Sequence, residues 1–364
     1  MPEKRRNTLK AWILHDVNDI RFEDMEKPSL SAEEMLVKVR AAGICGSDIP
    51  RIYRDGAHKM PLIPGHEFSG EVVESGEAVS RNWTGKRVGV FPLIPCQKCA
   101  SCISKQYEMC SAYSYLGSRR DGAFAEYVAV PEWNLIELPD EVSFEQAAML
   151  EPMSVAVHAM RRCMDSDLLE IVKRKNGTVL VYGLGTIGLM MTMFLTDAGI
   201  ENLMVIGNKP SQLDMITRMG ISEDRYCDSS QNDVKSRVYD MTGGRGADIA
   251  FECVGRAETV SAVIDLAAPA GRVMFVGNPY SDMNLDKSIY WKILRNQLTI
   301  LGTWNSSFTH SSDDDWHYVL ERLQKKCISP EMFISHKYDL CHLERGLHIM
   351  RDKSETYIKE MVVC

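Results

Sequence analysis

The residues that could do chemistry begin between positions 43 and 70, where a cysteine, a histidine and a glutamate stand among glycines. Cys45 offers a thiolate, His66 an imidazole and Glu67 a carboxylate, and Zn²⁺ accepts sulfur, nitrogen and oxygen ligands in tetrahedral geometry. Glycines beside such ligands let the backbone fold closely around a metal. One cysteine or one histidine alone is more often a buried core residue, so the interpretation depends on the rest of the chain.

A second group of thiols lies further along, with the spacing C-x2-C-x2-C-x7-C. Four thiolates at this spacing can close a tetrahedral shell, as in a structural zinc site. A redox pair or a chance grouping is the plain alternative, and an iron–sulfur cluster would use the same four thiolates. The usual bacterial iron–sulfur run ends in x3-C-P, which this segment lacks, so zinc is preferred. The four residues are Cys96, Cys99, Cys102 and Cys110.

A glycine-rich turn, G-L-G-T-I-G, follows the predicted strand 178–182 and opens the predicted helix 187–198. In that setting the glycines let a pyrophosphate approach the backbone and the helix N-terminus. An ordinary turn between strand and helix is the alternative. The expected dinucleotide-binding residues are Gly183, Gly185, Thr186, Ile187 and Gly188, with Val254 and Val276 near the ends of later strands.

The end of the next strand favours one nicotinamide cofactor over the other. NAD-preferring sites place Asp or Glu there to bind the ribose 2′-hydroxyl, but strand 203–206 continues into Gly207, Asn208 and Lys209. Without the carboxylate a 2′-phosphate is not repelled, and Lys209 could neutralise it. We therefore expect NADP(H) to be favoured over NAD(H); the alternative is that Lys209 is an ordinary surface lysine.

The elements that must position these residues predict two domains. The chain has 364 residues, too long for one ordinary core, and a formal net charge of −8. Short alternating apolar stretches broken by Gly and Pro predict a β-rich domain before residue 150. Apolar strands alternating with helices after residue 178 predict a doubly wound parallel sheet, so the fold class is α/β.

The same composition restricts partners and location. The negative charge argues against nucleic-acid binding, and no apolar run is long enough to cross a membrane. The basic start is not followed by the apolar run of a secretory signal, and the 11 cysteines suit metal ligands or buried thiols better than disulfides. We expect a cytoplasmic protein.

Together these motifs resemble the zinc-containing medium-chain dehydrogenase/reductase family over nearly the whole chain, and most of all its polyol and polyol-phosphate branch. The resemblance implies a GroES-like zinc-binding catalytic domain at 1–157, a Rossmann domain at 158–302 and a C-terminal segment, 303–364, that returns to the first domain. It also implies a homodimer or homotetramer. The matching segments are GICGSD (43–48), GHEFSG (65–70), the four-cysteine loop, DGAFAEY (121–127), EP (151–152), GLGTIG (183–188) and ECVG (252–255).

The resemblance implies two zinc ions in each chain and a ligand set for the catalytic one. By motif position, Cys45, His66 and Glu151 would hold the catalytic zinc, and Asp48 would orient His66 from behind. Glu151 lies at the boundary between the β-rich and nucleotide-binding parts of the sequence, and cofactor and substrate sites are common between domains. As an isolated carboxylate it would more often be a helix N-terminal charge.

The chemistry that the resemblance implies is zinc-assisted hydride transfer between a secondary alcohol and NAD(P). Ser47 matches the hydroxyl that takes the alcohol proton, and Glu67 would exchange with Glu151 or with water. The best-known members carry a relay histidine a few residues after the serine. Here that region reads Asp48-Ile49-Pro50-Arg51, so the proton must leave Ser47 by another path.

The substrate is a small molecule, and a phosphate on it would need cations. Arg51, Arg119 and Arg120 stand in loops next to the motifs and could bind a phosphate through the planar guanidinium; each could instead be an ordinary surface charge. Three functions remain open: a polyol-phosphate dehydrogenase, a dehydrogenase of an unphosphorylated polyol or other secondary alcohol (sorbitol or threonine type), and a zinc or cofactor-binding protein without catalysis. The intact set of candidate catalytic residues argues against the third.

Overall fold

The computed structural model describes residues 8–364, and these form two compact units. The first unit is made of the chain up to Glu151 together with Ser307–Cys364, and the second of Pro152–Ser306. The second unit therefore interrupts the first in sequence. The junctions lie after 151 and after 306, whereas 157 and 302 were expected.

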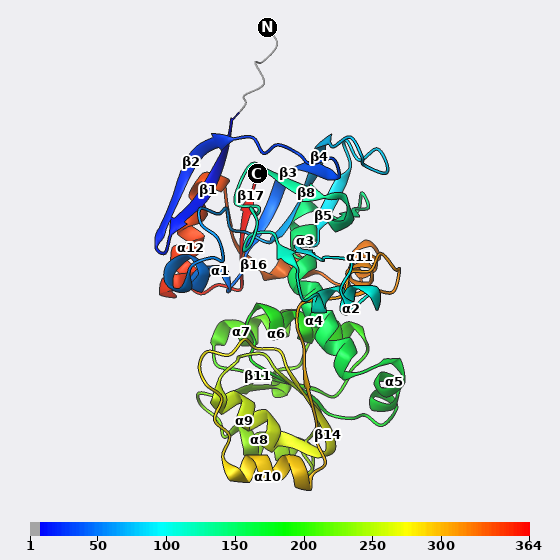
Figure 1. The fold of residues 1–364 in the computed structure, drawn as a ribbon. Helices are drawn as coiled ribbons and strands as arrows, with labels where there is room; N and C mark the ends of the chain where they lie inside the picture. Colours follow the sequence, from blue (N-terminus) through cyan, green and yellow to red (C-terminus); the bar gives the residue numbers. More distant parts are fainter. Residues whose placement is uncertain (1–7) are drawn as a thin grey trace. The chain divides into compact units, whose positions relative to one another are not determined.

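The first unit is built on a seven-stranded sheet around a strand that is buried along most of its length, β3. β3 pairs antiparallel with β4, β8 and β17. Figure 1 shows the C-terminal strand β17, in red, lying beside the blue β3. The last residues of the chain are thus held against the strand that leads to Cys45. The strands are β3 (Glu34–Ile44), β4 (Glu67–Ser75), β5 (Arg87–Val90), β8 (Tyr127–Pro131), β9 (Leu135–Glu137), β16 (Ile334–Tyr338) and β17 (Lys359–Val363).

Short elements connect these strands. The buried side chains between them form one apolar core that includes Trp12, Phe68 and Phe124. Helix α3 begins with a capping box, because Ser143 accepts from the Gln146 N–H and the Gln146 side chain accepts from the Ser143 N–H. The remaining elements are β1 (Thr8–Asp16), β2 (Asp19–Glu26), α1 (Asp48–Pro50), η1 (Arg51–Asp55), β6 (Leu93–Ile94), α2 (Ala100–Ile103), η2 (Tyr107–Met109), β7 (Ser114–Tyr115), η3 (Glu132–Asn134), α3 (Phe144–Ala148), α11 (Asp315–Gln324), η5 (Pro330–Phe333), η6 (Leu340–His342) and α12 (Leu343–Asp352). Helix α4 (Leu150–Cys163) starts in this unit and continues into the second.

The second unit is a six-stranded sheet in which every paired strand is parallel, in the order β12-β11-β10-β13-β14-β15. Its central strands are apolar and buried, as strands covered by helices must be. Figure 1 shows helices α6 to α10 around these strands. The strands are β10 (Val179–Tyr182), β11 (Leu203–Gly207), β12 (Tyr226–Asp228), β13 (Ala247–Glu252), β14 (Ala267–Phe275) and β15 (Thr299–Gly302). The helices are α5 (Ser166–Arg174), α6 (Thr186–Asp197), α7 (Pro210–Arg218), α8 (Val234–Met241), α9 (Ala257–Leu266) and α10 (Lys287–Arg295), with the short turn η4 (Glu223–Arg225).

The predicted doubly wound parallel sheet and the β-rich first domain are confirmed. Within residues 8–364, no helix combines the length and apolar character needed to cross a membrane.

Candidate active site

Three of the predicted chemical groups come together in the first unit. Cys45 follows β3, and Glu67 opens β4 directly after His66; the antiparallel pairing places Gly43 opposite Glu67, so the three side chains converge. One ligand atom from each of Cys45, His66 and Glu67 lies within 4.8 Å of the other two. His66 and Glu67 are buried and Cys45 is partly buried. A thiolate, an imidazole and a carboxylate at these separations fit a tetrahedral Zn²⁺ site.

Asp48 supports His66 from behind. Its fully buried carboxylate has Oδ1 3.4 Å from His66 Nδ1, and Oδ2 accepts from the Cys45 N–H at 3.0 Å. The Arg51 guanidinium donates to the same Oδ1 at 2.5 Å. Burial by itself would raise the pKa of Asp48, but the charges of His66 and Arg51 outweigh it and lower that pKa. A carboxylate that fixes one ring nitrogen leaves the other nitrogen for a metal.

Lys359 belongs to the site and was not among the residues predicted from the sequence. Its ammonium group, 2% exposed, contacts Glu67 Oε2 and donates to the Ile44 carbonyl at 3.0 Å. Burial would lower the pKa of Lys359, but the charges of Glu67 and Cys45 raise it above its ordinary value. The lysine is therefore a charged counter-ion for Glu67. The one signal in the sequence is an isolated lysine at the start of an apolar C-terminal strand.

Glu151 lies outside the group of Cys45, His66 and Glu67 but in the same buried region. Burial raises the pKa of Glu151 to about 7. The negative charge of Glu67 also raises this pKa, whereas the charge of His66 lowers it. Its Oε1 accepts a hydrogen bond from the Tyr115 hydroxyl at 3.2 Å. The Tyr115 ring meets His66 edge-on, with centroids 5.9 Å apart. Tyr115 is a second residue of the site that sequence spacing did not identify.

Ser47 lies beside the same group. Its hydroxyl donates to Cys45 Sγ at 3.4 Å, which is a sulfur-accepted hydrogen bond. It is partly buried at the start of α1. The predicted catalytic hydroxyl is thus within hydrogen-bonding reach of a candidate ligand.

The four cysteines of the second motif also converge. One Sγ from each lies within 4.8 Å of the others; Cys99 Sγ is 3.5 Å from that of Cys102 and 3.9 Å from that of Cys110. Backbone N–H groups of Cys102 and Ser111 lower the pKa of the Cys99 thiol to about 5. Four thiols at one point fit the closed shell of a structural zinc site. Cys96 completes the group.

In the second unit the glycine-rich turn joins β10 to α6. A Cβ at Gly188 would lie 1.8 Å from the Gly183 carbonyl oxygen, so only glycine fits there. A Cβ at Gly185 would meet nothing within 4 Å, which leaves the backbone open to a ligand. Thr186 and Ile187 form the first turn of α6, where the helix N-terminus favours an anion.

The turn after β13 lies against this glycine-rich turn. Val254 packs on Gly183, and the Val276 N–H donates to the Glu252 carbonyl at 2.8 Å. The buried Glu252 carboxylate accepts from the N–H groups of Val254 and Gly255, both at 2.9 Å. Glu252 therefore fixes the turn that carries Val254.

The loop after β11 is tied to the glycine-rich turn by Gln212. Its Oε1 accepts from the N–H groups of Asn208 at 2.8 Å and of Lys209 at 3.1 Å, while its Nε2 donates to the Leu184 carbonyl at 2.9 Å. A Cβ at Gly207 would lie 2.4 Å from the same Oε1. Asn208 and Lys209 are exposed.

The three candidate substrate arginines have different partners. Arg51 is bound to Asp48, and Arg120 contacts Glu34, a carboxylate that is buried. Arg119 is exposed and lies over the Tyr113 ring, with the guanidinium carbon 4.5 Å from the centroid.

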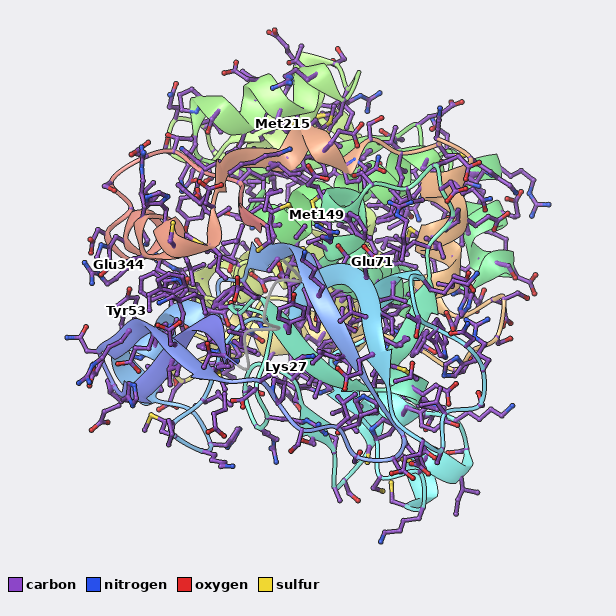
Figure 2. All side chains as sticks on the ribbon, turned by 90° about the horizontal axis from the view of Figure 1, so that it is seen from above. Lys27, Tyr53, Glu71, Met149, Met215 and Glu344 are labelled. Atoms are coloured by element: carbon purple, nitrogen blue, oxygen red, sulfur yellow. The ribbon has the colours of Figure 1, made fainter. Side chains whose placement is uncertain are left out.

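Tyr53, which follows α1 in η1, packs towards α12. Figure 2 shows it near Glu344 of that helix, and Arg351 of the same helix lies over its ring at 4.8 Å. Burial raises the pKa of Tyr53 to about 12. Its place against α12 is that of a packing residue.

Comparison with known proteins identifies the class. Residues 31–140 match the family model of the alcohol dehydrogenase GroES-like domain, and residues 186–325 match that of zinc-binding dehydrogenases. Galactitol 1-phosphate 5-dehydrogenase from Escherichia coli K12 is 31% identical over 305 residues, which is 84% of this chain and 85% of the relative. Sorbitol dehydrogenase from Bacillus subtilis is 28% identical over 308 residues, 83% of this chain and 84% of that protein. The chain belongs to the zinc-containing medium-chain alcohol and polyol dehydrogenases.

Solved structures agree with this assignment. Galactitol-1-phosphate dehydrogenase from Escherichia coli superposes with a TM-score of 0.88 at 28% identity, over 98% of this chain and all of that one (100%). A zinc-binding dehydrogenase from Sinorhizobium meliloti, bound to NADP, gives a TM-score of 0.86 at 26% identity, over 99% and 100% of the two chains. The predicted family and fold class are confirmed: the protein is an oxidoreductase of a class that uses zinc and NAD(P).

Proposed function

We propose that this protein is a zinc-dependent dehydrogenase that transfers a hydride between a secondary alcohol of a polyol phosphate and NADP. The observation that carries the chemistry is the convergence of Cys45, His66 and Glu67 next to Glu151 and Ser47. The similarity to galactitol 1-phosphate 5-dehydrogenase supports the substrate class.

The buried ion pairs favour Glu151 over Glu67 as the third ligand. Lys359 already compensates the charge of Glu67, and Arg51 compensates Asp48. Within residues 8–364, neither Cys45 nor Glu151 belongs to a described ion pair, although the charges of His66 and Lys359 act on Glu151. A buried thiolate and a buried carboxylate would need a cationic partner, and Zn²⁺ would supply it. We propose Cys45, His66 and Glu151 as ligands, with Glu67 held beside them by Lys359.

When bound, zinc supplies Lewis-acid chemistry that makes the substrate hydroxyl more acidic. Ser47 would accept the hydroxyl proton and release its own hydroxyl proton towards solvent, and the nicotinamide, when bound, would supply the hydride acceptor. Asp48 and Arg51 keep His66 in one orientation. Glu252 keeps the turn of Val254 in place against the glycine-rich turn, where the cofactor would bind.

Phosphate recognition is proposed for Arg119 first. Arg51 and Arg120 are bound to Asp48 and Glu34, so a phosphate would have to displace a buried carboxylate to reach them. For Arg119, no carboxylate partner is found in the described part of the chain. A guanidinium can bind a phosphate through two N–H groups.

The experiment compares kcat/KM for galactitol 1-phosphate with that for free galactitol and sorbitol. We expect a strong preference for the ester and a loss of about 10- to 100-fold for R119A on the ester alone, since one charge-assisted bond contributes about 1.5–3 kcal/mol. R54A is the matched control, because Arg54 is exposed and paired with Asp55. Equal rates on ester and free polyol would favour the second candidate, a dehydrogenase of unphosphorylated polyols, which the similarity to sorbitol dehydrogenase supports.

NADP is the proposed cofactor because the loop after β11 offers Asn208 and Lys209 where an NAD site carries a carboxylate. The NADP-bound neighbour supports this choice. We expect NADP⁺ to be preferred over NAD⁺ in kcat/KM and K209Q to reduce that preference about tenfold. K175Q, which removes another exposed lysine of the second unit, is the control. A preference for NAD⁺ would contradict the proposal.

Two zinc ions per chain and a homodimer or homotetramer complete the proposal. Strand β15 is the last strand of the parallel sheet, and Tyr290, Trp291 and Leu294 of α10 are more than half exposed, at 56%, 54% and 51%. An unpaired sheet edge beside exposed apolar side chains is a natural contact between copies. Light scattering should show a dimer or tetramer, and metal analysis two equivalents of zinc. A cytoplasmic location stays a prediction.

A further inference from the structure

Tyr115 contacts two of the proposed metal ligands at once. Its hydroxyl donates to Glu151 Oε1 at 3.2 Å, and its ring edge faces the His66 imidazole. None of the sequence motifs includes a role for it, and the reaction proposed above does not use it.

The backbone fixes Tyr115 independently of Glu151. Tyr115 pairs with Leu93 in the two-stranded β6–β7 sheet. Its carbonyl accepts the N–H groups of Arg119 at 2.9 Å and of Arg120 at 3.1 Å. The backbone position of Tyr115 is thus set by contacts that do not involve Glu151.

The two carboxylates of the site are held in different ways. Glu67 forms an ion pair with Lys359, so the ammonium group compensates the negative charge of the Glu67 carboxylate. Glu151 is bound by a neutral hydroxyl, which occupies one oxygen and leaves the carboxylate charge available to a metal. A carboxylate with both oxygens free can bind a metal through either or both of them.

We propose that Tyr115 is a positioning residue that holds Glu151 Oε1, so that Glu151 can offer only Oε2 as a ligand. This inference rests on the proposed function, because it takes Glu151 as a zinc ligand. Catalytic zinc sites keep one coordination position open, and a second carboxylate oxygen would fill it. The hydroxyl of Tyr115 therefore preserves the position that the substrate needs.

The test uses the full chain with the variants Y115F and Y113F. Y115F removes the hydroxyl and keeps the ring against His66. Y113F is the matched control, because it removes a hydroxyl two residues away. The Tyr113 ring meets the Tyr115 ring edge-to-face, with centroids 6.3 Å apart and an interplanar angle of 76°. Thermal unfolding establishes that both variants fold, and Co²⁺ in place of the catalytic zinc reports the coordination number through its visible absorption.

In Y115F we expect the intensity of the visible Co²⁺ absorption to fall towards that of a five-coordinate ion. The KM for the alcohol should rise about tenfold, and the KM for the nicotinamide cofactor should stay unchanged. Loss of an outer partner of a metal ligand typically costs about 10- to 100-fold in metal affinity or activity. Y113F should match the wild type in both measurements.

Two results would overturn the inference and spare the proposed function: a Y115F protein with wild-type absorption and KM, or a Y113F protein with the same changes as Y115F. A wild-type protein that binds one equivalent of metal, at the four cysteines, would overturn both the inference and the proposed function.

Discussion

Replacing Lys359 by methionine tests the electrostatic design of the site. Methionine keeps the length and apolar character of the side chain but removes the ammonium that contacts Glu67 and the Ile44 carbonyl. Glu67 would then be a buried carboxylate, 1% exposed, without its counter-ion. The change alters one charge and leaves the packing of β17 on β3 nearly intact.

The expected cost follows from burial. Removing one partner of a buried ion pair destabilises a protein by about 3–5 kcal/mol. In a domain of this size, 1 kcal/mol lowers the Tm by about 2–4 °C, so the Tm of K359M should fall by roughly 10 °C. Because the pKa of Lys359 is raised, the stabilisation is complete at neutral pH and is lost only when strongly alkaline pH deprotonates the lysine. The cost should therefore be the same from about pH 6 to 9.

Chemical unfolding of the zinc-loaded protein measures this loss. K337M is the control, because Lys337 forms an ion pair with Glu145 on the surface and is 53% exposed; it should cost less than about 1 kcal/mol. The double variant E67Q/K359M should recover part of the stability, since it leaves no unpaired buried charge. Removing the proposed zinc should enlarge the cost of K359M, because a divalent cation bound beside Glu67 would also compensate that carboxylate. A K359M protein as stable as K337M, or no recovery in the double variant, would refute the reasoning.

Three further outcomes follow from other parts of the chain. D265N should lose about 1–2 kcal/mol of unfolding free energy at pH 7. Burial would raise the pKa of Asp265, but Lys235 and Lys292 outweigh it and lower that pKa. The stabilisation is therefore present near neutrality, and urea titrations should show it disappear as the pH falls below the ordinary Asp range. C99S should reduce the zinc content from two equivalents to one by metal analysis, because three thiolates do not close the structural shell. G185A should unfold like the wild type but bind NADP about tenfold more weakly in a fluorescence titration, because an added Cβ would stand where the backbone is open to a ligand. G188A should be destabilised by about 1–3 kcal/mol, because its Cβ would meet the Gly183 carbonyl. Equal stability of the two glycine variants would contradict this expectation.

The sequence alone determined the groups of residues that are local along the chain. The four cysteines are at most 14 residues apart, from Cys96 to Cys110, and the glycine-rich turn lies within one strand–turn–helix unit, so spacing was enough to predict both. The alternation of strands and helices likewise predicted the parallel sheet, because it depends on the period of apolar residues rather than on distant contacts.

The tertiary structure decided which side chains meet across long separations. Lys359 reaches Glu67 from 292 residues away because β17 pairs with β3, and Tyr115 reaches Glu151 from a two-stranded sheet that no motif predicts. It also decided that Arg120 is bound to Glu34, so a cation that looked available in the sequence is partnered in the fold. The physical reason is that a charged group removed from water needs an opposite charge or a hydrogen-bonding partner next to it. The pairing of distant strands decides which group that is, and the spacing of residues in the sequence does not show it.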